Sequence, residues 1–220
     1  MDKVYLYDTT LRDGAQGEGI SFSDAGKVRF ARLLDEFGVD FIEGGFAGSN
    51  PRDRRFFEDI RKESLGHARI TAFGSTRRVD RDAKDDEQLA GLLAAETEWV
   101  TIYGKSWLLH VKDVLRTTGE RNHQMIADTV GFLRAAGRQV VFDAEHFFDG
   151  YKADPGYALG ALRAAVGEGA AAVALCDTNG GSLPHEVFEI VRAVCQAFPG
   201  VQVGIHTHND SGLAVANSLE

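Results

Sequence analysis

Short apolar runs alternate with helix-like segments seven times along the chain, and this alternation constrains the fold most. The runs are rich in Val, Ile, Phe and Tyr, which is typical of strands in a parallel sheet. They begin at Val4 and then cover 39–42, 68–73, 99–103, 139–146, 170–176 and 201–206. A (β/α)₈ TIM barrel has eight such units in about 250 residues. We therefore predict an α/β fold with one domain, 1–220: a TIM barrel that stops after about seven units, with an open sheet as the alternative.

Helical periodicity and capping residues predict the elements between these runs. The expected helices cover 24–37, 51–62, 86–95, 121–136, 157–166, 184–197 and 213–219. The connection from Gly104 to Gly119 is long for a parallel fold, and we expect it to hold a short helix on the side of the strand ends. That segment is a candidate substrate cover. We expect a polar, aromatic loop after the fifth strand.

Composition limits the partners and the compartment. The 24 Lys and Arg residues against 33 Asp and Glu residues give a net charge of −9, and the basic residues are scattered. This pattern argues against nucleic acid or an anionic membrane as a partner. The apolar run before Cys176 predicts a buried free thiol, and no stretch has the length or flanks of a membrane span or signal peptide. We therefore expect a cytoplasmic protein.

Charged and polar residues gather where the expected strands end. His206-x-His208 places two imidazoles on one face of an extended backbone, a spacing suited to one divalent ion. Taken alone, the pair is about as well explained as two loop histidines bonded to solvent or backbone. Asp13, at the end of the first run, favours the metal interpretation, because the first and seventh strands of a nearly closed barrel are neighbours. Such a set suits Mg²⁺, Mn²⁺, Zn²⁺ or Co²⁺.

The other strand ends supply candidate catalytic and substrate-binding residues. Arg12 is a permanent cation beside Asp13, and Glu43 is placed to hold it through a bidentate ion pair or to act only as a structural partner. Glu145 is a candidate base if the neighbouring phenylalanines raise its pKa, with a surface acid as the alternative. Asp143 lies on the same strand face as Glu145 and is a candidate substrate-binding residue. Thr178 can donate its hydroxyl to a substrate carboxylate or cap the turn.

These strand-end motifs together resemble one enzyme family. The runs DTTLRDG at 8–14 and HTHND at 206–210, with Glu43, are similar to those of the metal-dependent barrels that include 2-isopropylmalate, homocitrate and citramalate synthases and hydroxymethylglutaryl-CoA lyase. Five longer runs look most like the citramalate branch: 13–22, 48–51, 72–78, 104–107 and 143–151. The resemblance covers the whole chain.

The resemblance implies a Claisen condensation of acetyl-CoA, as co-substrate, with pyruvate to give citramalate. It assigns the metal to Asp13, His206 and His208, the keto oxygen to Arg12, the substrate carboxylate to Thr178 and acid-base catalysis to Glu145. It also implies a homodimer in the full-length protein. An eighth strand with a further Asn ligand, a helical subdomain and a regulatory domain are expected beyond this chain, so we predict weak or no turnover from these 220 residues alone.

Overall fold

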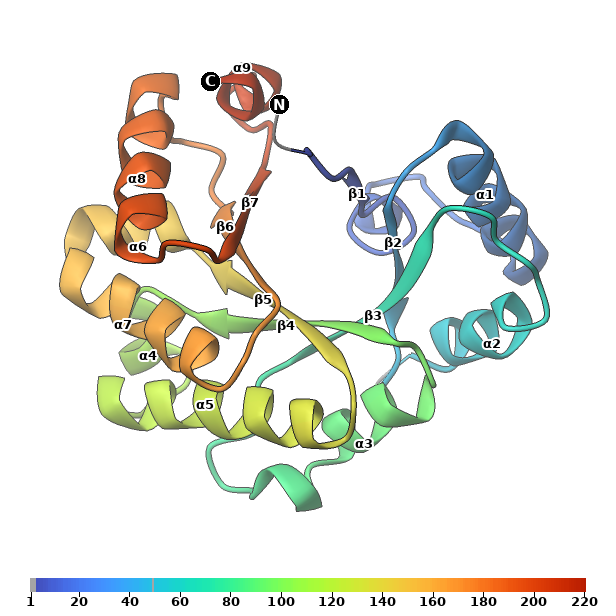
Figure 1. Cartoon of the computed structure of the whole chain (residues 1–220), viewed down its shortest axis with the longest axis horizontal. Helices are drawn as coiled ribbons and strands as arrows, with labels where there is room; N and C mark the ends of the chain where they lie inside the picture. The colour runs from blue at the N-terminus through green and yellow to red at the C-terminus, as the bar shows by residue number, and fades with distance from the viewer. Residues whose placement is uncertain (1–2, 49) are drawn as a thin grey trace.

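A computed structural model describes residues 3–48 and 50–220. The residues outside this description are Met1, Asp2 and Ser49, and Ser49 is part of the run 48–51 that resembles the citramalate branch. Seven parallel strands form one curled sheet in the order β1-β2-β3-β4-β5-β6-β7, with helices on its outer side (Figure 1). The strands are β1 (Tyr7–Asp8), β2 (Phe41–Phe46), β3 (Arg69–Ser75), β4 (Trp99–Lys105), β5 (Gln139–Glu145), β6 (Ala172–Asp177) and β7 (Gln202–Thr207). The barrel-type α/β fold with seven strands is therefore confirmed.

The helices match the sequence prediction with one exception. They are α1 (Asp24–Phe37), α2 (Pro51–Ile60), α3 (Glu87–Ala94), α4 (Leu108–Asp113), α5 (Gly119–Ala135), α6 (Phe147–Ala153), α7 (Pro155–Gly167), α8 (Pro184–Ala197) and α9 (Ala214–Leu219), with short 3₁₀ turns η1 (Gly14–Gln16) and η2 (Ala83–Asp85). The short helix expected in the long connection is α4. The loop expected after the fifth strand was wrong, because α6 begins there directly after His146, whose φ is +56°.

Side-chain caps explain why the helices begin where they do. The hydroxyl of Ser23 accepts the amide hydrogen of Gly26 at 3.1 Å, and Asp86, Thr118 and Asp154 cap α3, α5 and α7 in the same way. Gly38 ends α1 with a φ of +93°, a conformation that glycine adopts without strain. These caps set the ends of the helices, which lie on the outer side of the sheet (Figure 1).

The first strand is much shorter than the apolar run that predicted it. After Asp8 the chain turns, and the amides of Arg12, Asp13 and Gly14 all donate to the carbonyl oxygen of Thr9 at 2.8–3.2 Å. Leu11 is fully buried beneath this turn. Arg12 and Asp13 are therefore presented by a compact turn at the carboxyl end of β1, which we call the 9–14 turn, and not by the strand itself.

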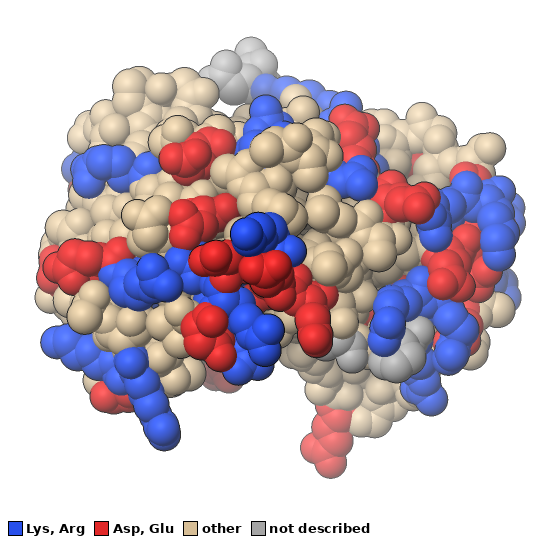
Figure 2. Space-filling model, turned by 90° about the horizontal axis from the view of Figure 1, so that it is seen from below, with Lys and Arg blue, Asp and Glu red and all other residues tan. Residues whose placement is uncertain are grey.

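The surface carries charges of both signs. On the face shown in Figure 2, Lys and Arg side chains lie among Asp and Glu side chains. Within residues 3–48 and 50–220, none of the helices has the length and apolar character needed to cross a membrane.

Candidate active site

Asp13 lies between two imidazoles contributed by the other end of the sheet. Its Oδ2 atom is 3.3 Å from Nε2 of His206 and 3.2 Å from Nε2 of His208. The three side chains are partly buried, and their candidate ligand atoms all lie within 4.8 Å of one another. Hydrogen bonds from the two histidines hold the pKa of Asp13 well below its usual range, and the contact with Asp13 raises the pKa of His208. The predicted cluster is brought together, and its donor set fits a divalent metal ion.

Arg12 is fixed on three sides. Its Nε donates to Oε2 of Glu43 at 2.5 Å, one of its terminal nitrogens donates to Asp13 at 3.1 Å, and its guanidinium lies 3.9 Å from the centre of the Phe73 ring. The pair with Glu43 was predicted, but it is not bidentate. The second oxygen of Glu43 accepts the hydroxyl of Tyr7 at 2.8 Å instead.

Glu43 lies in the interior, with 1% of its surface exposed. Burial raises its pKa to about 7, against the opposing effect of the Arg12 charge. The Tyr7 hydroxyl that binds it also lies 2.7 Å from the hydroxyl of Thr71 and 2.6 Å from that of Thr101. A polar network of strands β1 to β4 therefore supports the guanidinium from below.

Glu145 stands at the tip of β5, but its surroundings differ from the apolar pocket that the sequence suggested. Its carboxylate forms an ion pair with Lys105, and its side chain is 24% exposed. The phenylalanines 147 and 148 are fully buried in the core of the fold. The hydroxyl of Ser106 donates to the backbone oxygen of Glu145 at 2.6 Å. Lys105 and Ser106 thus hold both the side chain and the backbone of the candidate base.

Asp143 lies on β5 two residues before Glu145, and Thr178 directly follows β6. Asp143 is buried, which raises its pKa, and it accepts a hydrogen bond from the thiol of Cys176 at 3.0 Å. Burial also raises the pKa of Cys176 well above its usual value. The hydroxyl oxygen of Thr178 accepts the backbone amide hydrogen of His146 at 2.9 Å. This bond links Thr178 to the residue before α6 and not to its own turn, and it leaves the hydroxyl hydrogen of Thr178 available to donate.

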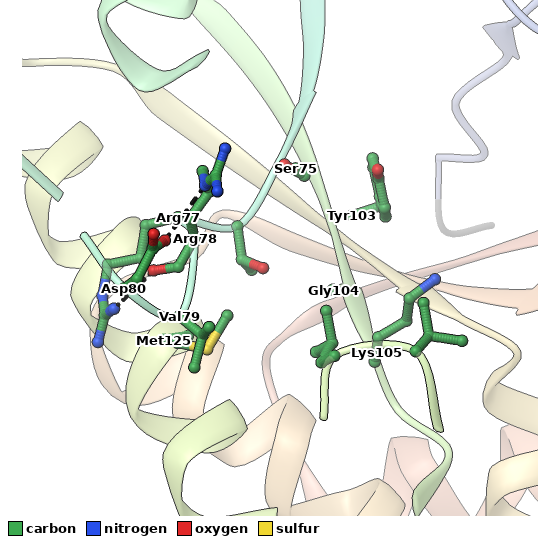
Figure 3. A pocket seen from close by; sticks show the side chains of 12 residues that line it. Ser75, Arg77, Arg78, Val79, Asp80, Tyr103, Gly104, Lys105 and Met125 are labelled. Atoms are coloured by element: carbon green, nitrogen blue, oxygen red, sulfur yellow. Dashed lines mark hydrogen bonds and ion pairs between the residues drawn. The ribbon is translucent and has the colours of Figure 1, made fainter. Parts of the chain in front are cut away.

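A pocket of about 480 Å³ lies at the carboxyl ends of β3 and β4. Figure 3 shows Arg77, Arg78 and Asp80 on one side of it and Tyr103 and Lys105 on the other. Lys105 therefore contacts the candidate base and also lines the pocket. Arg77 is fully buried and bound to Asp128 at 2.7 Å, so it supports the loop after β3.

Sequence reasoning missed four contributors to this site: Tyr7, Phe73, Lys105 and Cys176. Lys105 lies opposite Glu145 in the register of β4 and β5, and Cys176 lies opposite His206 in that of β6 and β7. Their positions near strand ends were visible, since Cys176 ends an expected strand and Lys105 lies two residues after another. Their partners depend on the register between strands, which a single sequence does not give.

The fold and the site define a protein of the parallel α/β-barrel class. A cluster of one carboxylate and two imidazoles lies at the carboxyl ends of its strands, beside an arginine held by an ion pair, and barrel enzymes have their active sites at this end. Comparison with known proteins agrees. The sequence matches the HMGL-like family over residues 3–220, and the chain belongs to that family.

Relatives and solved structures refine this assignment. Five curated (R)-citramalate synthases are 50–56% identical to the chain. The one from Aquifex aeolicus is 56% identical over 99% of this chain, and the 2-isopropylmalate synthase of Verminephrobacter eiseniae is 34% identical over 99%. This chain spans 41–42% of the length of those two proteins. The hydroxymethylglutaryl-CoA lyase of Bacillus subtilis shares the fold, with a TM-score of 0.80 and 17% identity over 99% of this chain and 72% of that one.

Proposed function

We propose that this chain carries the metal-binding side of an (R)-citramalate synthase active site, which condenses acetyl-CoA with pyruvate to give (R)-citramalate and CoA. The identity of 50–56% to five citramalate synthases along the whole chain carries this proposal. The convergence of Asp13, His206 and His208 beside Arg12 supports it. We further propose that the product belongs to the route to isoleucine.

Asp13, His206 and His208 are the proposed ligands of a divalent ion, Mg²⁺, Mn²⁺, Zn²⁺ or Co²⁺. A carboxylate with two imidazoles accepts all four, so the donor set alone does not choose among them. When bound, such an ion supplies Lewis acidity toward the carbonyl oxygen of a 2-oxo acid.

Arg12 is the proposed cation that stabilises negative charge on the keto oxygen of pyruvate during carbon-carbon bond formation. Its guanidinium is held by Glu43 and Phe73, so it needs no rearrangement when that charge develops. Glu43 acts on the substrate only through Arg12 and is a positioning residue.

Glu145 is the proposed base. Its carboxylate takes a proton from the acetyl methyl group, the resulting carbon attacks C2 of pyruvate, and the keto oxygen becomes a hydroxyl when it gains a proton. Hydrolysis of the thioester by water then releases CoA. Lys105 and Ser106 hold Glu145 in place for the first step. Thr178 donates its hydroxyl to the pyruvate carboxylate, and Asp143 provides a polar wall of the substrate site.

Two alternatives carry weight. A sister reaction with a bulkier 2-oxo acid, of the 2-isopropylmalate or homocitrate type, is supported by the 34% identity to a 2-isopropylmalate synthase. A lyase that catalyses the reverse carbon-carbon step is the other enzymatic alternative, since a hydroxymethylglutaryl-CoA lyase shares the fold. A non-catalytic metal-binding barrel fragment is the alternative outside enzymology, favoured by the open ends of the sheet at β1 and β7.

CoA release from acetyl-CoA with a panel of 2-oxo acids tests the proposal. The full-length gene product should prefer pyruvate, and Asp13→Asn should abolish turnover. A preference for 2-oxoisovalerate would replace citramalate synthase by 2-isopropylmalate synthase, and no CoA release with any oxo acid would favour the non-catalytic alternative. The 220-residue chain itself should turn over weakly or not at all.

We further propose that the full-length protein is a homodimer and lies in the cytoplasm. Sedimentation tests the homodimer, and cell fractionation tests the location.

A further inference from the structure

We propose that Asp143, Cys176 and His206 form a second metal position, which takes a thiophilic divalent cation such as Zn²⁺, Cd²⁺ or Co²⁺. Their candidate ligand atoms lie within 4.8 Å of one another. The three residues come from neighbouring strands, β5, β6 and β7, and Cys176 lies opposite His206 in the strand register. The sheet itself therefore holds the three donors together.

The second position lies deeper than the first. Asp143 is 8% exposed and Cys176 is 4% exposed, whereas the three residues of the first cluster are all of intermediate exposure. The Cys176 thiol donates to Oδ1 of Asp143 at 3.0 Å, so the two donor atoms already lie next to each other. Asp143 accepts the thiol hydrogen of Cys176, and a cation that replaces this hydrogen offsets the cost of burying the carboxylate and the thiolate that then forms.

The donor sets of the two positions select different metals. The first has one carboxylate and two imidazoles, while the second replaces one imidazole by a thiol sulfur. Sulfur favours Zn²⁺, Cd²⁺ and Co²⁺ over Mg²⁺ and Mn²⁺, which prefer oxygen. On binding, a metal-sulfur bond forms and the thiol proton passes to solvent, with no change of oxidation state.

The two positions share His206. An ion at the deeper position therefore competes with an ion at the outer one, and it also occupies Asp143, the proposed wall of the substrate site. If the proposed function holds, thiophilic ions inhibit the enzyme at concentrations where Mg²⁺ or Mn²⁺ sustains it. The binding itself rests on the geometry alone.

Titration of the reduced 220-residue chain with Co²⁺ tests the second position without any need for activity. Coordination by sulfur gives a sulfur-to-cobalt charge-transfer absorption in the near ultraviolet, which oxygen and nitrogen ligands do not give. We expect this band in the wild-type chain and its loss in Cys176→Ser. Cys195→Ser is the matched control, because Cys195 is an exposed free cysteine on α8 and its replacement should leave the band intact.

Two more variants keep the test decisive. His208→Ala removes a ligand of the outer position only, so the band should persist or strengthen. Asp143→Asn keeps the shape of the side chain and should weaken Co²⁺ binding more than about tenfold. Circular dichroism establishes that each variant is folded. The proposal is overturned if excess Co²⁺ gives no band in either the wild type or His208→Ala, or if the band survives in folded Cys176→Ser.

Discussion

Removing the Tyr7 hydroxyl tests the polar network beneath Arg12. A phenol donates one hydrogen bond and accepts two. Since an ionised Glu43 only accepts, Tyr7 donates to Glu43 at 2.8 Å and accepts from Thr71 and Thr101 at 2.7 and 2.6 Å. Tyr7→Phe keeps the ring that stacks on Phe41 and removes all three bonds. The hydrogen bond to the charged Glu43 contributes about 1.5–3 kcal/mol, and the two bonds to threonines contribute about 0.5–1.5 kcal/mol each. Because the threonine hydroxyls can rotate toward other partners, we expect the free energy of unfolding to fall by about 3 kcal/mol.

Urea unfolding of the 220-residue chain at about pH 8, above the pKa of Glu43 of about 7, measures this loss. Tyr5→Phe is the matched control, because Tyr5 lies two residues earlier and is 41% exposed, and its stability should change by less than about 0.5 kcal/mol. The assignment of the three hydrogen bonds would be refuted if both variants lowered the free energy of unfolding by the same small amount, with an unchanged dependence of that free energy on urea concentration.

Three further predictions follow from the site. In the active full-length protein, Lys105→Met should lower kcat/KM for acetyl-CoA about tenfold to a hundredfold, because Glu145 loses its ion-pair partner, and Lys105→Arg should recover part of this loss. Lys112→Met is the control, since Lys112 is exposed on α4 and its replacement should leave kcat/KM unchanged. Equal rates in all variants would refute this role of Lys105. The pKa of Glu43 rises from 4.5 to about 7 on folding, so between these pH values the folded chain binds one proton more than the unfolded chain. The free energy of unfolding should therefore fall by up to about 3 kcal/mol as the pH rises through this window, compared with Glu43→Gln. Parallel pH profiles of the two proteins would contradict this prediction. Asp13→Asn should weaken the binding of Mn²⁺ to this chain more than about tenfold, as measured by calorimetry. Asp210 is exposed and lies two residues after His208, so Asp210→Asn is the control and should leave Mn²⁺ binding unchanged.

The sequence predicted the backbone framework and the metal cluster because both follow from rules that act along one strand at a time. Apolar runs and helix caps located the strands and all but one of the helices. Parallel strands expose their carboxyl ends at one edge, so Asp13, His206 and His208 had to approach one another once the sheet curled. The exception, α6, follows a residue in the left-handed region, and its mixed polar and aromatic sequence has no clear helical period.

Contacts between strands were harder to predict, because they depend on register. The sequence placed Glu145 near two phenylalanines that follow it in the chain, but these residues enter the core through α6. The residue that does contact Glu145 is Lys105, its register partner on β4. The same reason hid the bond between Cys176 and Asp143, although the burial of Cys176 was predicted and is confirmed.

The 9–14 turn has a structural role that follows from its contacts. Through Arg12 it binds Glu43 on β2, and through Asp13 it contacts both histidines of the β7 end. Strands β1 and β7 are the two ends of the strand order, so these contacts join opposite ends of the curled sheet. An ion bound by Asp13, His206 and His208 would therefore cross-link those ends, and its binding energy would add to the stability of the curled form. The side chains proposed to bind the ion are therefore also the ones that connect the two open ends of the sheet, and Asp13→Asn should weaken both the ion binding and this connection.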